Sequence, residues 1–315
     1  MSGAVKVVVA LGGNALEDKS LPPTAESQLR VAHRTAEYLA ELSCAGYELA
    51  VVHGNGPQVG RILLASEAAS QVTPALPFDV CGAMSQGYIG YHIQQALTAA
   101  LAKRDRHIPV VTVVTQMVVD ENDPAFREPT KPIGPFYSES EAKKLAAEKG
   151  YTVKEDSGRG WRRVVPSPKP IRIVEIGTIK TLWDSTITIA CGGGGIPVVE
   201  RGGILEGVAA VIDKDLAAAR LAEEMEADIL MILTEVPAVS IHFNTPEQTD
   251  LGTVTAAELE RYADAGEFGA GSMLPKVQAA AAFARSGPGR HAVITSLDKG
   301  VDALTGKCGT VITAG

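Results

Sequence analysis

Short β-branched runs alternate with alanine-rich stretches along almost the whole chain, and this alternation constrains the fold more than any other feature. Such an order favours a mostly parallel sheet with helices on both faces. Several runs are apolar throughout, as strands covered on both faces are. We predict strands at 5–11, 48–54, 109–119, 186–191, 228–234, 238–243 and 291–296.

Three of the intervening stretches carry apolar residues at the spacing of an amphipathic helix. These residues are Leu29, Ala32, Ala36 and Leu39; Ala218, Leu221, Ala222 and Met225; and Val277, Ala280, Ala281 and Ala284. The segment 120–175 departs from this rhythm, because it holds seven of the 18 prolines, a charged helix and basic patches. It predicts an inserted subdomain that projects from the sheet.

Composition excludes several classes of protein. A chain of 315 residues allows either one large α/β domain or two lobes. The net charge of −8, without a long Lys/Arg block, gives no reason to expect a nucleic acid or an anionic membrane as partner. No apolar run approaches the roughly 20 residues of a membrane helix, and the start lacks a signal-peptide pattern. Widely spaced cysteines disfavour disulfides and a zinc site, so we expect reduced thiols and a cytoplasmic location.

Three glycine-rich turns each follow a predicted strand: "LGGNAL" (11–16), "HGNGPQVG" (53–60) and "CGGGGIP" (191–197). In an open α/β sheet, ligands collect at the carboxyl ends of strands, where bare backbone amides suit anions. Three such turns predict one phosphate-sized pocket, although any one of them could simply permit a sharp turn. Neither the dinucleotide G-x-G-x-x-G spacing nor a true P-loop is present.

Three lysines are candidates for binding an anion in that pocket. Asp213 can cap a helix whose first turn holds Lys214 and Asp215, and Lys276 follows Pro275 in the opening turn of another helix. Lys131 lies between prolines in the inserted segment. The alternatives are a solvated Lys214, an exposed capping acid at Asp215 and an ordinary loop lysine.

Phosphoryl transfer would explain why these parts occur together, because it requires positioning and charge stabilisation with little covalent chemistry. In such a site, Asp215 could align the lysines or help to hold Mg²⁺. The histidines show no metal spacing, and no nucleophile elbow is present. His53 is either near the pocket or packed at a strand end.

These stretches together resemble the carbamate kinases of the amino-acid kinase superfamily. The matching motifs, in chain order, are "VVALGGNAL", "HGNGPQVG", "PTKPIGPF", "KEDSGRGWRRVVPSPKPI", "CGGGGIPVV", "GVAAVIDKDLAA" and "GSMLPKVQAA". They span nearly the whole chain. The motifs "PTKPIGPF" and "GRGWRRVVPSPKP" are the most specific, because the insertion that carries them distinguishes carbamate kinases within the superfamily.

The resemblance implies a three-layer αβα sandwich with two lobes and a small protruding subdomain at about 120–175. The N-terminal lobe, 1–208, would bind carbamate or carbamoyl phosphate, and the lobe 209–315 would bind ADP or ATP. It also implies a homodimer, a requirement for Mg²⁺, and reversible transfer from carbamoyl phosphate to ADP, which we expect in ATP-generating arginine catabolism.

The same resemblance implies roles for individual residues. Lys214 and Lys276 would hold the transferring phosphoryl group, Asp215 would orient them, and Lys131 would reach in from the subdomain. The substrate would be cradled by Gly12, Gly13, Asn14, Gly54, Asn55, Gly193 and Gly194; the nucleotide would contact Lys214, Asp215, Thr234, Met273 and Lys276. We assign no metal ligand in the protein, and we expect a side chain at Gly193 or Gly194 to harm transfer more than stability.

The segment "TEVPAV" departs from the family pattern at Glu235 and Pro237, beside the expected nucleotide site. Two other functions are compatible with the sequence: a kinase acting on an amino-acid carboxylate, and a non-catalytic nucleotide sensor. The first usually needs an arginine clamp, and the second should have lost the lysines.

Overall fold

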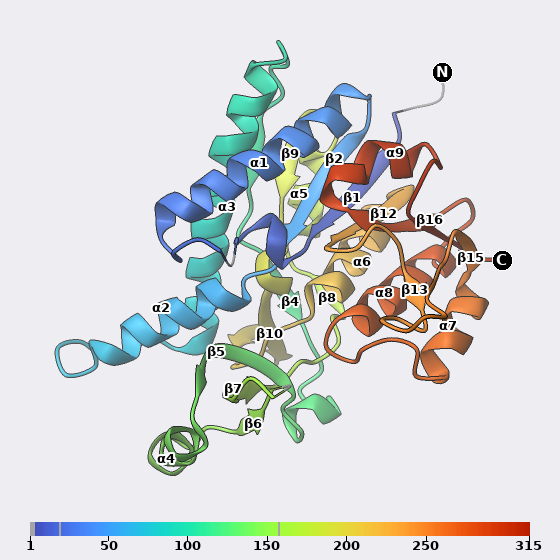
Figure 1. The fold of residues 1–315 in the computed structure, drawn as a ribbon. Helices are drawn as coiled ribbons and strands as arrows, with labels where there is room; N and C mark the ends of the chain where they lie inside the picture. The colour runs from blue at the N-terminus through green and yellow to red at the C-terminus, as the bar shows by residue number, and fades with distance from the viewer. Residues whose placement is uncertain (1–3, 19, 157) are drawn as a thin grey trace.

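An eight-stranded sheet forms the centre of the computed structural model, which describes residues 4–18, 20–156 and 158–315, without the side chain of Asn14 (Figure 1). The strand order is β15-β17-β16-β12-β1-β2-β9-β3, and only the pair β16 and β17 is antiparallel. The strands are β1 (Lys6–Leu11), β2 (Glu48–His53), β3 (Val110–Thr112), β9 (Ile187–Ile189), β12 (Ile229–Thr234), β15 (Thr253–Thr255), β16 (His291–Ser296) and β17 (Thr310–Thr313).

Side chains of β1 alternate between two separate cores, one on each face of the sheet. Val7, Val9 and Leu11 pack with α1 (Ala25–Cys44), α3 (Phe78–Ala102) and α9 (Gly300–Leu304). Val8 and Ala10 pack with the second group: α5 (Ile176–Leu182), α6 (Lys214–Glu224), α7 (Ala256–Asp264) and α8 (Met273–Arg285). The predicted three-layer α/β fold with a mostly parallel sheet is confirmed, and the three predicted helices are α1, α6 and α8.

Two predicted strands are wrong in extent. The segment 109–119 forms two strands in different sheets, β3 and β4 (Gln116–Val118), and Gln86 of α3 binds the backbone between them. Its side chain accepts a hydrogen bond from Thr115 N at 2.8 Å and donates one to Thr115 O at 3.0 Å, and the same Thr115 O accepts a hydrogen bond from Ile196 N at 2.8 Å. Of 238–243, only β13 (Ser240–Ile241) is a strand, and it pairs with β14 (Thr249–Asp250) outside the central sheet.

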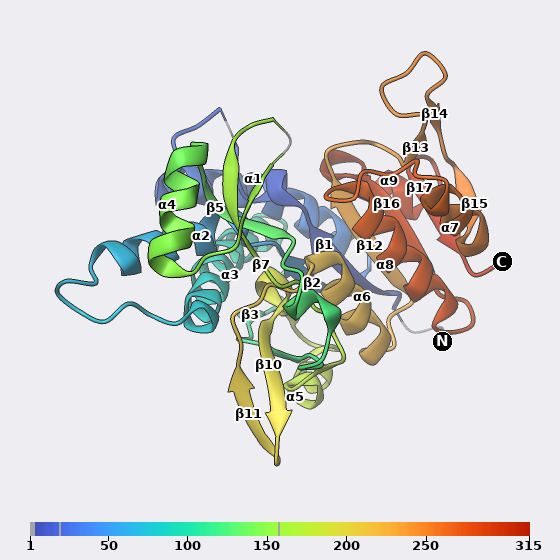
Figure 2. The same ribbon diagram turned by 90° about the horizontal axis from the view of Figure 1, so that it is seen from below.

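A four-stranded sheet of order β11-β10-β4-β8 lies beside the central one. Its remaining strands are β8 (Arg172–Ile173), β10 (Ile196–Arg201) and β11 (Ile204–Gly207), and the hairpin of β10 and β11 projects from the molecule in Figure 2. The four consecutive glycines lie between β9 and β10. They therefore join the central sheet to the four-stranded sheet.

Most of the segment 120–175 forms a projecting unit with its own three-stranded sheet, which we call the inserted subdomain (Figures 1 and 2). Its elements are β5 (Lys131–Tyr137), α4 (Glu139–Lys149), β6 (Val153–Glu155) and β7 (Trp161–Val165), in the sheet order β5-β7-β6. It lies against α2 (Gly56–Ala68) through a small apolar cluster of Val59, Leu63, Phe78, Cys81, Ile133 and Val165.

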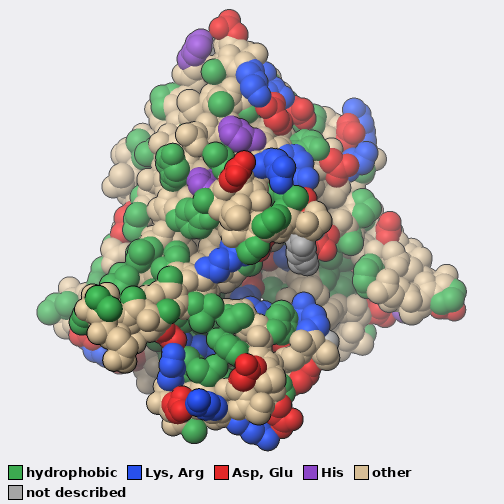
Figure 3. Space-filling model, turned by 60° about the vertical axis from the view of Figure 1, so that its left-hand side comes forward, with side chains coloured by type: hydrophobic (Ala, Val, Ile, Leu, Met, Phe, Trp, Pro, Cys, Tyr) green, Lys and Arg blue, Asp and Glu red, His purple; other side chains and the backbone are tan. Residues whose placement is uncertain are grey.

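The remaining elements of the described ranges are short 3₁₀ helices: η1 (Gly13–Ala15), η2 (Pro124–Phe126), η3 (Gly192–Gly194) and η4 (Leu297–Lys299). Among the described residues, no helix is both long and apolar enough to cross a bilayer. On the face shown in Figure 3, basic and acidic side chains are mixed among apolar ones, and a recess with basic side chains at its edge lies near the middle.

Candidate active site

A cavity of about 1330 Å³ lies at the carboxyl ends of the central strands. The turns after β1 and β2 and the glycine run after β9 all contribute to its wall, through Gly12, Gly54 and Gly193. They meet there because β1, β2 and β9 are parallel neighbours, so their carboxyl ends share one edge of the sheet. The first turns of α6 and α8 and the start of β5 also line the cavity.

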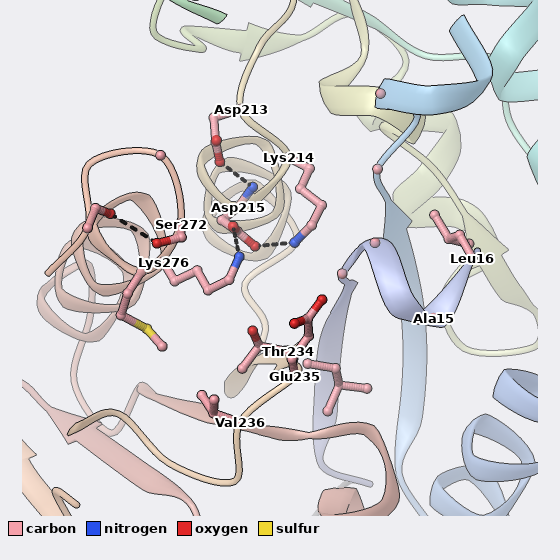
Figure 4. A pocket seen from close by; sticks show the side chains of 18 of the residues that line it. Ala15, Leu16, Asp213, Lys214, Asp215, Thr234, Glu235, Val236, Ser272 and Lys276 are labelled. Carbon is pink, nitrogen blue, oxygen red and sulfur yellow. Dashed lines mark hydrogen bonds and ion pairs between the residues drawn. The ribbon is translucent and has the colours of Figure 1, made fainter. Parts of the chain in front are cut away.

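Two lysines point at one buried carboxylate on the cavity wall (Figure 4). Lys214 Nζ lies 2.5 Å from Asp215 Oδ1, and Lys276 Nζ lies 2.8 Å from Asp215 Oδ2. Each lysine side chain is 14% exposed and Asp215 is 2% exposed, which contradicts the alternatives of a solvated lysine and an exposed capping acid. Both carboxylate oxygens of Asp215 are thus engaged by lysines, which favours an orienting role over metal binding.

Local sequence places this cluster, which we call the lysine cluster (Lys214, Asp215 and Lys276). Asp213 is the N-cap of α6, and its Oδ1 accepts a hydrogen bond from Asp215 N at 2.9 Å. Packing of α6 against α8 then brings Lys276 to the same carboxylate. The amino ends of both helices face the cavity, and their dipoles add to the positive charge there.

Electrostatics fix the charge states of this cluster. Burial opposes ionisation of Asp215, but Lys214 and Lys276 outweigh it and lower the pKa of Asp215 to about 2. Burial also lowers the pKa of Lys214, and the neighbouring Lys276 acts in the same direction, against the attraction of Asp215. One carboxylate shared by two lysines leaves a net positive charge next to the cavity, which suits a phosphoryl group.

The inserted subdomain contributes one more cation. Lys131, the first residue of β5, lines the cavity and donates a hydrogen bond from Nζ to Asp213 Oδ2 at 2.6 Å. Its partner is therefore the same residue that caps α6. Lys131 and the lysine cluster together put three cations around one cavity.

The glycine run adopts a backbone that other residues rarely take. Gly193, Gly194 and Gly195 have φ of 66°, 97° and 84°. A Cβ on Gly193 would stand 2.2 Å from Asn55 Nδ2, and one on Gly194 would stand 2.3 Å from Ile212 O. Both residues are buried, so a side chain at either position would disturb packing as well as the cavity.

Most of the predicted site residues line this one cavity. They are Gly12, Gly13, Gly54, Asn55, Lys131, Gly193, Lys214, Asp215, Thr234, Met273 and Lys276. Gly194 does not line it and packs instead against the backbone of Ile212. The side chain of Asn14 lies outside the described residues.

His53 is fully buried at the end of β2 and is not part of the cavity wall. Its Nδ1 lies 2.8 Å from the carbonyl oxygen of Gly54, and burial lowers its pKa to about 4. The neutral ring therefore donates Nδ1–H to Gly54 and stabilises the glycine turn. Of the two interpretations of His53, the packed strand-end histidine is the one observed.

Sequence reasoning missed several residues of the wall. Arg34 and Tyr38 reach it from α1, and Ser272 lies beside the start of α8. Asp213 was predicted only as a cap, whereas it also accepts the hydrogen bond from Lys131. No local pattern marks Arg34, because its spacing in α1 is that of any surface residue.

A divalent cation bound mainly by substrate fits this wall better than one caged by protein. The described residues contain no group of three His, Cys, Asp or Glu side chains placed to hold a metal ion. Mg²⁺ usually keeps several waters and binds through one or two carboxylates together with substrate phosphates. Glu235 and Asp298 are among the carboxylates that line the cavity, just after β12 and β16.

Glycine turns at a parallel sheet edge, facing two lysines on one buried carboxylate, define a site for phosphoryl transfer. The chain belongs to the amino acid kinase family, whose model matches residues 5–296. Within that family it belongs to the carbamate kinases. It is 54% identical over 311 residues to the carbamate kinase of Pyrococcus horikoshii, a match that covers 98% of this chain and 99% of the relative.

Two further comparisons agree with this assignment. The carbamate kinase of Clostridium perfringens is 54% identical over 312 residues, covering 98% of this chain and 99% of that protein. Among solved structures, carbamate kinase from Giardia lamblia bound to AMP-PNP superimposes with a TM-score of 0.91 at 45% identity, over 99% of each chain.

Proposed function

We propose that the cavity carries out reversible phosphoryl transfer, in which carbamoyl phosphate and ADP give carbamate and ATP. The observation that carries this proposal is the shared carboxylate, with Lys214 and Lys276 on opposite oxygens of Asp215. Three cations and two helix amino ends around one cavity suit the binding of phosphorylated substrates.

The chemistry asks little of the protein beyond charge and position. The bond between phosphorus and the carbamate oxygen breaks while a terminal oxygen of the ADP β-phosphate forms the new bond, and carbamate leaves as an anion. No proton needs to move, so the reaction does not require a general acid or base. The buried, neutral His53 outside the wall is therefore consistent with this chemistry. Lys214 and Lys276 would hold the phosphoryl oxygens as charge moves from one substrate to the other.

Each side of the cavity has residues suited to one substrate. Carbamoyl phosphate would lie against Gly12, Gly13, Gly54, Asn55 and Gly193, with Lys131 above it. The nucleotide would lie toward Thr234 and Met273. We keep the division into lobes 1–208 and 209–315 as part of this proposal, and Mg²⁺ would neutralise the nucleotide phosphates, with Glu235 and Asp298 nearby.

We also propose that the protein is a homodimer. Val80, Met84 and Tyr91 form an apolar stripe on the outer face of α3 and are 38%, 47% and 58% exposed. Such a stripe on a helix is typical of a surface covered by a second subunit. Met84→Glu should give monomers in light scattering coupled to gel filtration, whereas Val72→Glu, at a loop residue 91% exposed, should not.

Free thiols at all four cysteines suit the proposed cytoplasmic location.

The direct test is ATP formation from ADP and carbamoyl phosphate with Mg²⁺, and a coupled enzyme assay measures the ATP. Acetyl phosphate replaces carbamoyl phosphate in one arm, and N-acetylglutamate with ATP tests the rival carboxylate kinase in another. We expect ATP from carbamoyl phosphate and little product in the other two arms. A wild-type protein that forms no ATP would contradict the proposed function.

A further inference from the structure

One face of α2 is turned toward the inserted subdomain. Val59, Leu63 and Glu67 follow one another at intervals of four residues, so they lie along one stripe of the helix. The first two join the apolar cluster that contains Ile133 of β5. Between them, a Cβ on Gly60 would stand 2.6 Å from the Cα of Gly134, which shows how closely the two backbones approach.

Glu67 ends this stripe with a carboxylate that three subdomain residues share. Lys149 Nζ lies 2.5 Å from Oε2, the Tyr151 hydroxyl donates to Oε1, and Arg163 lies 3.7 Å from Oε1. These residues belong to the end of α4, the turn after it, and β7. The Glu67 side chain is only 16% exposed, so the contacts are largely shielded from water.

Arg163 connects this carboxylate to the strand that carries Lys131. Its guanidinium carbon lies 3.8 Å from the centre of the Tyr151 ring, whose hydroxyl contacts the same oxygen of Glu67. In the pairing of β5 with β7, Arg163 faces Ile133 and Val165 faces Lys131. A shift of Arg163 along or across β7 would therefore move the start of β5, where Lys131 enters the cavity.

Helix α2 has its other end at the cavity. It begins at Gly56, directly after Asn55, and Gly56, Pro57, Gln58 and Val59 line the wall. Val59 and Glu67 are separated by eight residues, about 12 Å along the helix. One rigid element thus carries both a part of the substrate wall and the carboxylate that holds the subdomain.

We propose that Glu67 is a positioning residue for phosphoryl transfer: by holding Lys149, Tyr151 and Arg163 on α2, it fixes where Lys131 stands relative to the substrate. This inference builds on the proposed function. Lys131 has a second attachment at Asp213, which a bound phosphate can replace as its partner. Glu67 keeps the subdomain in place when that exchange occurs.

The test is steady-state kinetics of Glu67→Gln, with KM measured separately for carbamoyl phosphate and for ADP. We expect KM for carbamoyl phosphate to rise about tenfold, because a small displacement of a positioned group has a large cost, and KM for ADP to change less than about twofold. Glu139→Gln is the matched control, since Glu139 also pairs with a subdomain lysine, Lys143, but both side chains are exposed. It should behave as wild type.

A double-mutant cycle separates positioning from general stability. In a Lys131→Ala background, Glu67→Gln should add little further loss, because the group that it positions is gone. Additive losses would contradict the proposal, as would an unchanged KM for carbamoyl phosphate in an active wild type. Absence of ATP formation in the wild type would overturn the proposed function as well. If Glu67→Gln folds poorly, Tyr151→Phe should give a smaller rise of the same kind, about twofold, and no rise would count against the proposal.

Discussion

The inner and outer walls of the cavity achieve similar charge placement in different ways. The inner wall consists of the lysine cluster and the glycine run, and its charged groups are buried and joined to one another by short contacts. The outer wall is the start of β5 with Lys131, whose side chain is 34% exposed and depends on a subdomain that projects from the sheet. The inner wall is thus built for fixed electrostatics, and the outer wall for a contact that can change during the reaction.

The largest effect should come from removing the inner cations. We expect Lys214→Ala combined with Lys276→Ala to lower kcat by about 10³-fold or more, because in the proposed reaction each lysine stabilises the transferring group. ATP formation under saturating substrates measures this loss. Lys143→Ala, on the exposed face of α4, is the control. A double variant as active as wild type would remove the distinction between the walls.

Gly194→Ala should cause the next largest effect, and the effect should be on stability. Its Cβ would meet Ile212 O at 2.3 Å from a backbone with φ of 97°, so we expect a loss of about 3 kcal/mol in the free energy of unfolding. Gly13→Ala, where a Cβ would meet nothing within 4 Å, should cost far less. Urea denaturation distinguishes the two. Equal stability of both variants would mean that the glycine run tolerates side chains.

Acidification should destabilise the fold through His53, which lies buried behind the inner wall. Burial lowers its folded-state pKa to about 4 from 6.5, so the unfolded chain binds more protons between these values. Stability is therefore complete above about pH 6.5 and falls as the pH drops toward 4; between pH 7 and pH 5 this amounts to about 2 kcal/mol. His53→Asn should show a correspondingly shallower decline in urea denaturation. His107→Asn, at an exposed histidine, should keep the wild-type slope.

The smallest effect is expected at the outer wall. Lys131→Ala should raise KM for carbamoyl phosphate about tenfold and leave the affinity for ADP nearly unchanged, because Lys131 is proposed to enter from the side that binds carbamoyl phosphate. Calorimetric titration with ADP and steady-state kinetics measure the two quantities. Equal losses of affinity for carbamoyl phosphate and for ADP would mean that Lys131 acts on both substrates, as the lysines of the inner wall do.

Local sequence was sufficient for the parts of the site that short segments determine. A capping aspartate followed by Lys214 and Asp215, and a lysine after Pro275, specify two helix starts without knowledge of the rest of the chain. The convergence of the three glycine turns followed from parallel strand order. Membership of the carbamate kinases followed from motifs that span the chain, and the comparisons confirm it.

Features that depend on distant contacts could not be predicted in this way. The split of 109–119 lies at Thr115, whose backbone is bonded to Gln86, a residue of the distant helix α3. The expectation that a side chain at Gly194 harms transfer more than stability did not include the contact of this glycine with Ile212, which makes a loss of stability the expected result as well. The pairing of Lys131 with Asp213 joins residues 82 positions apart and leaves no trace in either local pattern.

The central sheet passes through both proposed lobes without a break. Strand β1, near the amino terminus, lies between β2 and β12, and five of its residues pair with β12, from Val7 opposite Ile229 to Leu11 opposite Leu233. During synthesis, a ribosome must therefore add more than 200 residues before β1 gains its second neighbour. Until then the nascent chain presents an apolar strand edge, which is a template for aggregation. The amino-terminal half should depend on chaperones or on rapid completion of the chain, and the two halves produced as separate polypeptides should be soluble only when they are made together.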